Sequence, residues 1–86
     1  MTSSTKQSRP GRRAPIDRER LMRKRFEAGL TQMELAEAAG TTAQQISRIE
    51  IGKAGVSARL LHRIAGALGC PVADLMPAEQ GEAKPE

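Results

Sequence analysis

Residues 43–48 include five whose types and spacing suit the edges of DNA bases. On a helix these residues share one outward face that is short, polar in character and uncharged apart from one Arg. The major groove of DNA presents a pattern of hydrogen-bond donors and acceptors to such a face. The face therefore predicts contact with base edges, and it consists of Ala43, Gln44, Gln45, Ser47 and Arg48.

Two short helical patterns in Thr31–Gly52 would position this face. Thr31 and Glu34 have the spacing of a capping box, in which each side chain satisfies a backbone N–H. Gly40 stands where the first helix should end, because glycine adopts a left-handed conformation without a Cβ clash. Thr41 and Thr42 both offer the next N-cap, and a connection of about three residues forces the two helices to pack at a steep angle. The inward positions of the second helix are Ile46 and Ile49.

Three further helical patterns flank this pair. One spans Ile16–Ala28, one follows Ser57 as its N-cap and ends at Gly69, and a short one spans Pro71–Met76. β-Branched residues form no alternating runs, which argues against a sheet. We therefore predict an all-α domain of five helices over residues 16–76. The broad inward face of its first helix is expected to contain Leu21, Met22, Arg25, Phe26 and Ala28.

Composition limits the classes of protein that remain. The 86 residues suffice for one small domain, and no apolar run approaches the roughly 18 residues that a membrane span requires. The N-terminus lacks an apolar signal segment, so we expect a cytoplasmic protein without a membrane partner, associated with the nucleoid when bound to DNA. Cys70 is the single Cys, and we interpret it as a small buried hydrophobe. With no nucleophile–base pair, acid pair or metal-ligand spacing, neither an enzyme nor a cofactor is expected.

The net charge of +4 is concentrated towards the N-terminus. Residues 1–15 contain four basic side chains and no acidic one, and we expect a disordered arm there. Such an arm is either a solubilising tail or a segment that follows phosphates or enters an adjacent minor groove. In the second case Arg12 and Arg13 are candidate phosphate contacts. The polar residues 77–86 are expected to form a second disordered tail.

Two other positions are candidate phosphate contacts. Gln32 lies in the first turn of its helix, beside unsatisfied N–H groups and the positive end of the helix dipole, although an ordinary surface Gln is the alternative. Lys53 lies in a Gly-rich loop at the exit of the third helix.

An ordered set of short motifs runs from about Ile16 to Met76. Its members are Arg25, Gly29-Leu30-Thr31-Gln32, Glu34-Leu35-Ala36, Gly40, Ile46-Ser47-Arg48-Ile49-Glu50, Gly52-Lys53, Leu60, Ala65, Leu68-Gly69 and Asp74-Leu75. In this order they resemble the helix-turn-helix domain of lambdoid phage repressors, Cro proteins and related bacterial regulators. The resemblance implies five helices, of which the second and third form the motif and the third, residues 42–50, lies in the major groove.

The resemblance also implies roles for single residues. Base reading falls on Ala43, Gln44 and Arg48, with Gln45 and Ser47 at the margins. A Gln can bind adenine through N6 and N7, an Arg can bind guanine through O6 and N7, and Ala can touch only a thymine methyl.

Phosphate contacts and a structural ion pair are implied as well. Thr42 and Gln32 match positions that contact phosphate, and we add Ser47 to these candidates. Arg25 and Glu50 match a buried ion pair that links the first helix to the end of the third. The chain departs from the family pattern at Ile51, where an Asn is common, and in the loop of residues 54–56, which lacks a frequent Pro.

We therefore expect a sequence-specific regulator of transcription, a repressor, that binds double-stranded DNA as a homodimer. A single domain with about three base readers discriminates weakly, because each good pair contributes roughly 1–3 kcal/mol. The alternatives are an antitoxin-type autorepressor with a protein partner, and a protein-interaction module that uses the same fold without DNA.

Overall fold

The computed structural model describes residues 13–78 of the chain. Four α-helices, one 3-10 helix and two short strands make up this part. Its elements are β2 (Arg13–Ala14), α1 (Arg18–Glu27), α2 (Gln32–Ala39), α3 (Ala43–Glu50), β3 (Val56–Ser57), α4 (Ala58–Leu68) and η1 (Val72–Leu75). The predominantly helical fold predicted from the sequence is therefore present.

The helices begin where capping side chains satisfy their first N–H groups. Thr31 Oγ1 accepts from the N–H of Glu34 at 3.0 Å, and the Glu34 carboxylate accepts from the N–H of Thr31 at 2.9 Å, which completes the capping box. Thr42 and Ser57 cap α3 and α4 in the same way, accepting from Gln45 N at 3.0 Å and Leu60 N at 3.1 Å. Gly40 ends α2 at φ 77°, a left-handed conformation that favours glycine.

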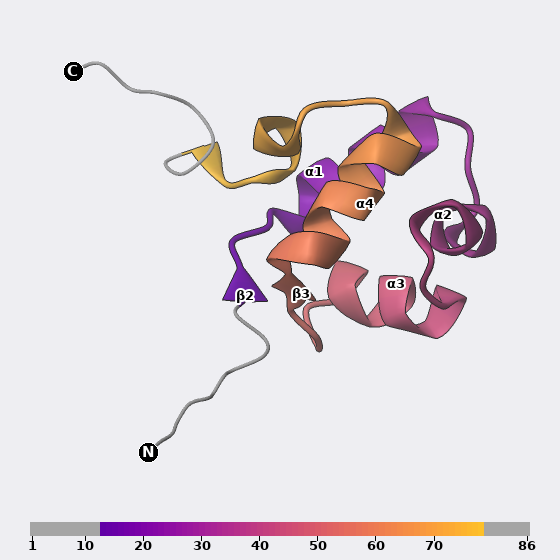
Figure 1. Ribbon diagram of the computed structural model, residues 1–86, viewed down its shortest axis with the longest axis horizontal. Helices are drawn as coiled ribbons and strands as arrows, with labels where there is room; N and C mark the ends of the chain where they lie inside the picture. Colours follow the sequence, from indigo (N-terminus) through magenta and orange to yellow (C-terminus); the bar gives the residue numbers. More distant parts are fainter. Residues whose placement is uncertain (1–12, 79–86) are drawn as a thin grey trace.

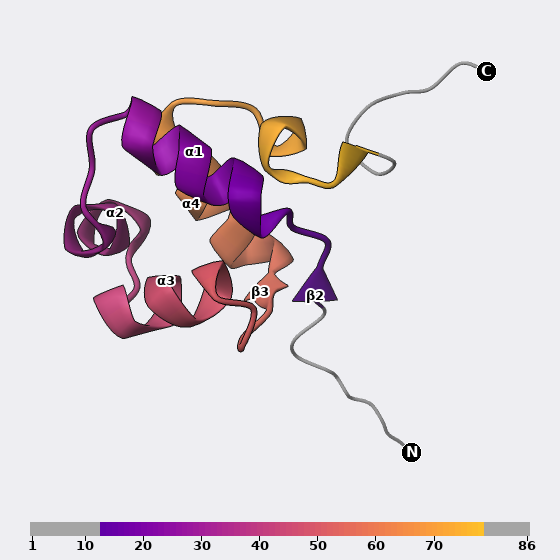
Figure 2. The same cartoon turned by 180° about the vertical axis from the view of Figure 1, so that it is seen from behind.

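α2 and α3 form the helix-turn-helix. Figures 1 and 2 both show α2 nearly end-on and α3 in the plane of the view, so the two helices cross steeply. α4 packs against α2, and α1 packs against α3. α4 lies in front of α1 in Figure 1 and behind it in Figure 2. The core between them is aliphatic, and its largest fully buried side chains are Leu21, Leu35, Ile46, Ile49, Val56, Ile64 and Leu75.

The N-terminal segment corrects two expectations at once. Strand β2 pairs antiparallel with β3, with Arg13 opposite Ser57 and Ala14 opposite Val56. The domain therefore contains a small two-stranded ribbon, and residues 13–15 belong to the domain instead of to a disordered arm. Two-residue strands carry no alternating pattern that the sequence could reveal. The predicted disorder of residues 1–12 and 79–86 lies outside the described residues.

Two helix boundaries also differ from the prediction. α1 begins at Arg18 because Asp17 is its N-cap, accepting from Glu19 N at 3.0 Å and Arg20 N at 3.2 Å. The fifth helix is the 3-10 helix η1, whose four residues are too few for a stable α-helix. Among the described helices, none is long and apolar enough to cross a membrane.

Phe26 lies on the surface instead of on the inward face of α1. Its side chain is 68% exposed, while Leu21 and Arg25 are the buried residues of this helix. The guanidinium carbon of Arg25 lies 4.7 Å from the centre of the Phe26 ring, a cation–π distance. Because Arg25 turns inward to an acidic partner, the next residue along the helix is rotated outward.

Candidate nucleic-acid interface

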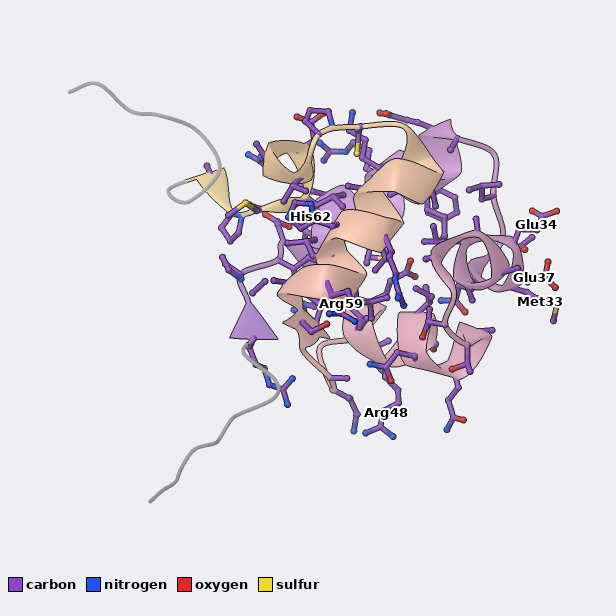
Figure 3. The ribbon with its side chains drawn as sticks, viewed as in Figure 1. Met33, Glu34, Glu37, Arg48, Arg59 and His62 are labelled. Atoms are coloured by element: carbon purple, nitrogen blue, oxygen red, sulfur yellow. The ribbon has the colours of Figure 1, made fainter. Side chains whose placement is uncertain are left out.

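The outer side of α3 carries the residues that the sequence predicts to contact base edges. We call this set the recognition face, and it consists of Gln44 and Arg48 with their neighbours Ala43, Gln45 and Ser47. Gln44 and Arg48 are exposed and one helical turn apart, while the three neighbours are half-buried. Figure 3 shows Arg48 projecting from α3 away from the rest of the domain. The opposite side of the helix is fixed by Ile46 and Ile49, which are fully buried.

An ion pair anchors the end of α3 to α1. Arg25 Nε donates to Glu50 Oε2 at 2.8 Å and Arg25 Nη2 donates to Glu50 Oε1 at 3.1 Å, with the two residues 8% and 5% exposed. Arg25 Nη1 also donates to the carbonyl of Leu30 at 3.0 Å. Arg25 and Glu50 thus form the ion pair expected from the sequence, and its two-pronged geometry restricts the orientation of α3.

Gln32 joins this network, which was not anticipated. Its Nε2 donates to Glu50 Oε1 at 2.9 Å, so the amide connects the start of α2 to the end of α3. The expected contact of Gln32 with a DNA phosphate remains a prediction, and it requires the amide to exchange this bond or to share its second hydrogen. No spacing in the sequence predicts the bond, because residues 32 and 50 meet only through the crossing of two helices.

The other predicted phosphate contacts surround the recognition face. Thr42 is exposed, and since its oxygen accepts from Gln45 N, its own hydroxyl hydrogen remains free to donate. Ser47 is half-buried on α3, and Lys53 is exposed in the loop beyond it. Arg13 is exposed on β2, whereas Arg12 lies outside the described residues.

The loop after α3 offers few backbone donors to a ligand. The N–H groups of residues 51–54 all donate to carbonyls of α3, at distances between 2.8 and 3.2 Å. They thereby satisfy the last turn of the helix, with Gly52 in the left-handed conformation at φ 85°. Ile51, which replaces the frequent Asn of the family pattern, is 55% exposed here.

Two arginines from the N-terminal side lie against this loop. A Cβ at Gly52 would come within 3.0 Å of Arg18 Cζ, and a Cβ at Gly55 would come within 2.7 Å of Arg13 Cδ. Arg18 was not among the residues singled out from the sequence. A contact between residues 34 positions apart leaves no local signal, although the absence of a side chain at Gly52 is compatible with a close neighbour.

No cluster of three or more His, Cys, Asp or Glu side chains in the described part of the chain could hold a metal ion. His62 is exposed on α4. Burial raises the pKa of the half-buried Cys70 thiol, Asp74 raises it further and Lys24 opposes the shift. The thiol is therefore neutral near pH 7 and a weak nucleophile.

Fold and recognition face together define a helix-turn-helix DNA-binding domain. The chain belongs to the HTH_3 helix-turn-helix family, whose model matches residues 20–75. The family consists of DNA-binding transcriptional regulators and not of enzymes, and double-stranded DNA is its ligand.

Three similar proteins are named as regulators or controllers. A 45-residue stretch is 56% identical to an uncharacterized HTH-type transcriptional regulator of Methanothermobacter thermautotrophicus, covering 52% of this chain and 65% of that protein. The chain thus aligns with less than two thirds of that relative's length.

Two solved structures are similar as well. The restriction-modification controller protein C.AhdI from Aeromonas hydrophila superposes with a TM-score of 0.67 at 29% identity, covering 69% of this chain and 89% of that one. The clp gene regulator ClgR from C. glutamicum gives a TM-score of 0.62 at 38% identity, covering 66% and 74%.

Proposed function

We propose that this chain is a sequence-specific repressor of transcription that inserts α3 into the major groove. The observation that carries the proposal is the outward direction of Gln44 and Arg48 on a helix whose other side is locked by Ile46, Ile49 and the Arg25–Glu50 pair. A rigid helix loses little entropy when its side chains meet base edges. The names of the similar proteins, a controller protein and two regulators, support the same role.

Each residue of the interface has a chemical part in this proposal. Gln44 binds adenine through N6 and N7, and Arg48 binds guanine through O6 and N7. Ala43 faces a thymine methyl, and Gln45 extends the base-reading surface at its margin. Phosphate oxygens are bound by side-chain donors around the face, which fix the register but carry no sequence information. These donors are Thr42, Ser47 and Lys53. Gln32 joins them once its amide has exchanged the bond to Glu50 for one to a phosphate.

A homodimer follows from the number of base readers. Two hydrogen-bonding readers contribute roughly 2–6 kcal/mol of discrimination, whereas specific sites typically exceed non-specific DNA by about 4–10 kcal/mol. Two copies on a two-fold-related operator double the number of readers, with half-sites about one helical turn apart. Selection of bound sites from a random DNA pool would reveal the two-fold symmetry, and an asymmetric single half-site would contradict the dimer.

The test of base reading is the double substitution Gln44→Ala and Arg48→Ala. We expect specific footprints to disappear while the far-ultraviolet circular dichroism stays that of wild type, because both side chains are exposed and hold no core contact. Arg23→Ala is the matched control, since it removes the same charge from the outward side of α1. Footprints unchanged in the double variant would refute the assignment of α3, and a chain that binds no DNA would favour the protein-interaction alternative.

A further inference from the structure

The loop that follows α3 is covered by two arginine side chains from the N-terminal end of the domain. A Cβ at Gly55 would lie 2.7 Å from Arg13 Cδ and 3.1 Å from its Cζ. A Cβ at Gly52 would lie 3.0 Å from Arg18 Cζ and 3.4 Å from its Cδ. Real Cβ atoms essentially never approach within 3.0 Å of a neighbour, so a side chain at either glycine would require the arginine lying on it to shift.

The backbone at both arginines is held in place by the fold. The pairing of Arg13 with Ser57 joins β2 to the strand directly after the loop. Arg18 is the first residue of α1, and the N–H of Asp17 before it donates to the carbonyl of Leu75 at 2.8 Å. The Asp17 carboxylate caps α1 and so is directed to Glu19 N and Arg20 N. The fold therefore fixes the backbone positions from which both arginine side chains extend to the loop.

The positive charges around this loop have no acidic partner among residues 13–78. Lys53 is exposed between the two glycines, and residues 51–57 contain no acidic side chain. The ion pairs of the described part involve other residues. Since the N–H groups of residues 51–54 already bind α3 carbonyls, side chains are the donors available to an anion at these residues.

The loop lies on the same edge of the domain as the recognition face. In both Figure 1 and Figure 2, β2, β3 and the loop before β3 follow α3 along one edge. Figure 3 shows Arg48 projecting from that edge, whereas Glu34 and Glu37 lie on the outer side of α2. DNA that met Arg48 would therefore pass the loop and not the acidic side of α2.

We propose that Arg13, Arg18 and Lys53 form a phosphate clamp that holds the DNA backbone beside the bases read by α3. Gly52 and Gly55 are part of this clamp because their lack of a side chain lets the two guanidinium groups lie on the loop. The inference rests on the proposed function, and it adds Arg18 and the two glycines to the interface. Phosphate is the shared ligand, so the clamp acts on every DNA sequence alike.

The first test measures the salt dependence of DNA binding by fluorescence anisotropy for Arg18→Ala, Arg13→Ala and Lys53→Ala in the full chain. The probes are an operator-containing duplex and a random-sequence duplex of equal length. Each lost phosphate contact should reduce the magnitude of the slope of log K against log salt by about 0.9 on both probes. Arg23→Ala, which removes an equal charge elsewhere, should leave the slope unchanged. Slopes of the Arg18 and Arg13 variants equal to that of wild type would overturn the clamp.

The second test separates the glycines from backbone strain. Gly55 does not have a positive φ, so Gly55→Ala displaces Arg13 without forcing a left-handed Ala. We expect Gly55→Ala to reduce the salt slope as Arg13→Ala does, and the double variant to show no further loss. Melting temperatures recorded on the same samples identify any loss that comes from unfolding. Additive effects in the double variant would show that Gly55 does not act through Arg13.

The outcomes distinguish this inference from the proposed function. If wild type binds neither duplex, the DNA-binding role fails and the clamp with it. If the Gln44 and Arg48 double variant loses preference for the operator while Arg18→Ala keeps the wild-type slope, only the clamp fails.

Discussion

At the scale of single residues, Arg25 determines much of how α3 is presented. Burying a guanidinium costs several kcal/mol of desolvation, which only a partner of good geometry offsets. Here the Glu50 carboxylate receives two donors from Arg25 and one from Gln32. These bonds connect the end of α1, the start of α2 and the end of α3 beside the recognition face.

Removing one member of this pair should be costly. We expect Arg25→Ala to lower the free energy of unfolding by about 3–5 kcal/mol, because Glu50 would remain buried without its cation. Urea titration followed by circular dichroism measures the change. The double variant Arg25→Met, Glu50→Leu should lose less than the single variant, because no charge is left uncompensated. A single variant as stable as wild type would contradict the account.

At the scale of elements, the rotation of α1 about its axis depends on which of its side chains can be buried with suitable partners in the core. Leu21 fills the core and Arg25 finds Glu50, so Phe26, the single aromatic residue, is left at the surface. The apolar pattern of α1 by itself predicted Phe26 on the inward face together with Leu21. The network around Glu50 therefore overrides the apolar pattern of the helix.

The rotation predicts unequal effects of two truncations on α1. Leu21→Ala should destabilise the domain by about 2–5 kcal/mol because it leaves a cavity in the core. Phe26→Ala should cost less than about 1 kcal/mol, in the range of an exposed cation–π contact. Thermal or urea unfolding of both variants checks the order. A larger loss for Phe26→Ala would mean that α1 is rotated with its ring inward.

At the scale of the whole molecule, charge is distributed unevenly around the domain. The recognition face, the loop after α3 and β2 carry basic side chains, while Glu34 and Glu37 lie on the outer side of α2. Residues 1–12 add Lys6, Arg9 and Arg12 directly before β2, and β2 lies on the edge that contains α3. This asymmetry orients the domain towards a polyanion before any base is read.

Deletion of residues 1–12 tests the contribution of the N-terminal charges. The deletion removes none of the described β2–β3 pairs, which join Arg13 to Ser57 and Ala14 to Val56. If the three basic side chains bind phosphate, the salt slope of DNA binding should decrease in magnitude by up to about 2.7, or about 0.9 for each. Anisotropy titrations at several salt concentrations measure it. An unchanged slope would make the segment a solubilising tail.

Local sequence signals were sufficient to predict the helix-turn-helix. The capping box at Thr31 and Glu34, the left-handed Gly40 and the cap at Thr42 act within about four residues, so their spacing is legible without a structure. The buried stripe of Ile46 and Ile49 follows from helical periodicity in the same way. Together these signals place Gln44 and Arg48 on an outward face. The Arg25–Glu50 pair was readable only through the family resemblance, because nothing local connects those positions.

Contacts between distant segments depended on how the helices pack. Helical periodicity carries no information about contacts between segments that are distant in the sequence. Four such features appear only in the structure: the β2–β3 ribbon, the bond of Gln32 to Glu50, the outward position of Phe26, and the arginines over Gly52 and Gly55. Each arises because burying the aliphatic core sets the relative positions of the helices, and polar groups must then find partners in the geometry that results. The amino-acid pattern thus defines which helices form and which face of α3 points outward. Tertiary packing determines which charges converge beside that face.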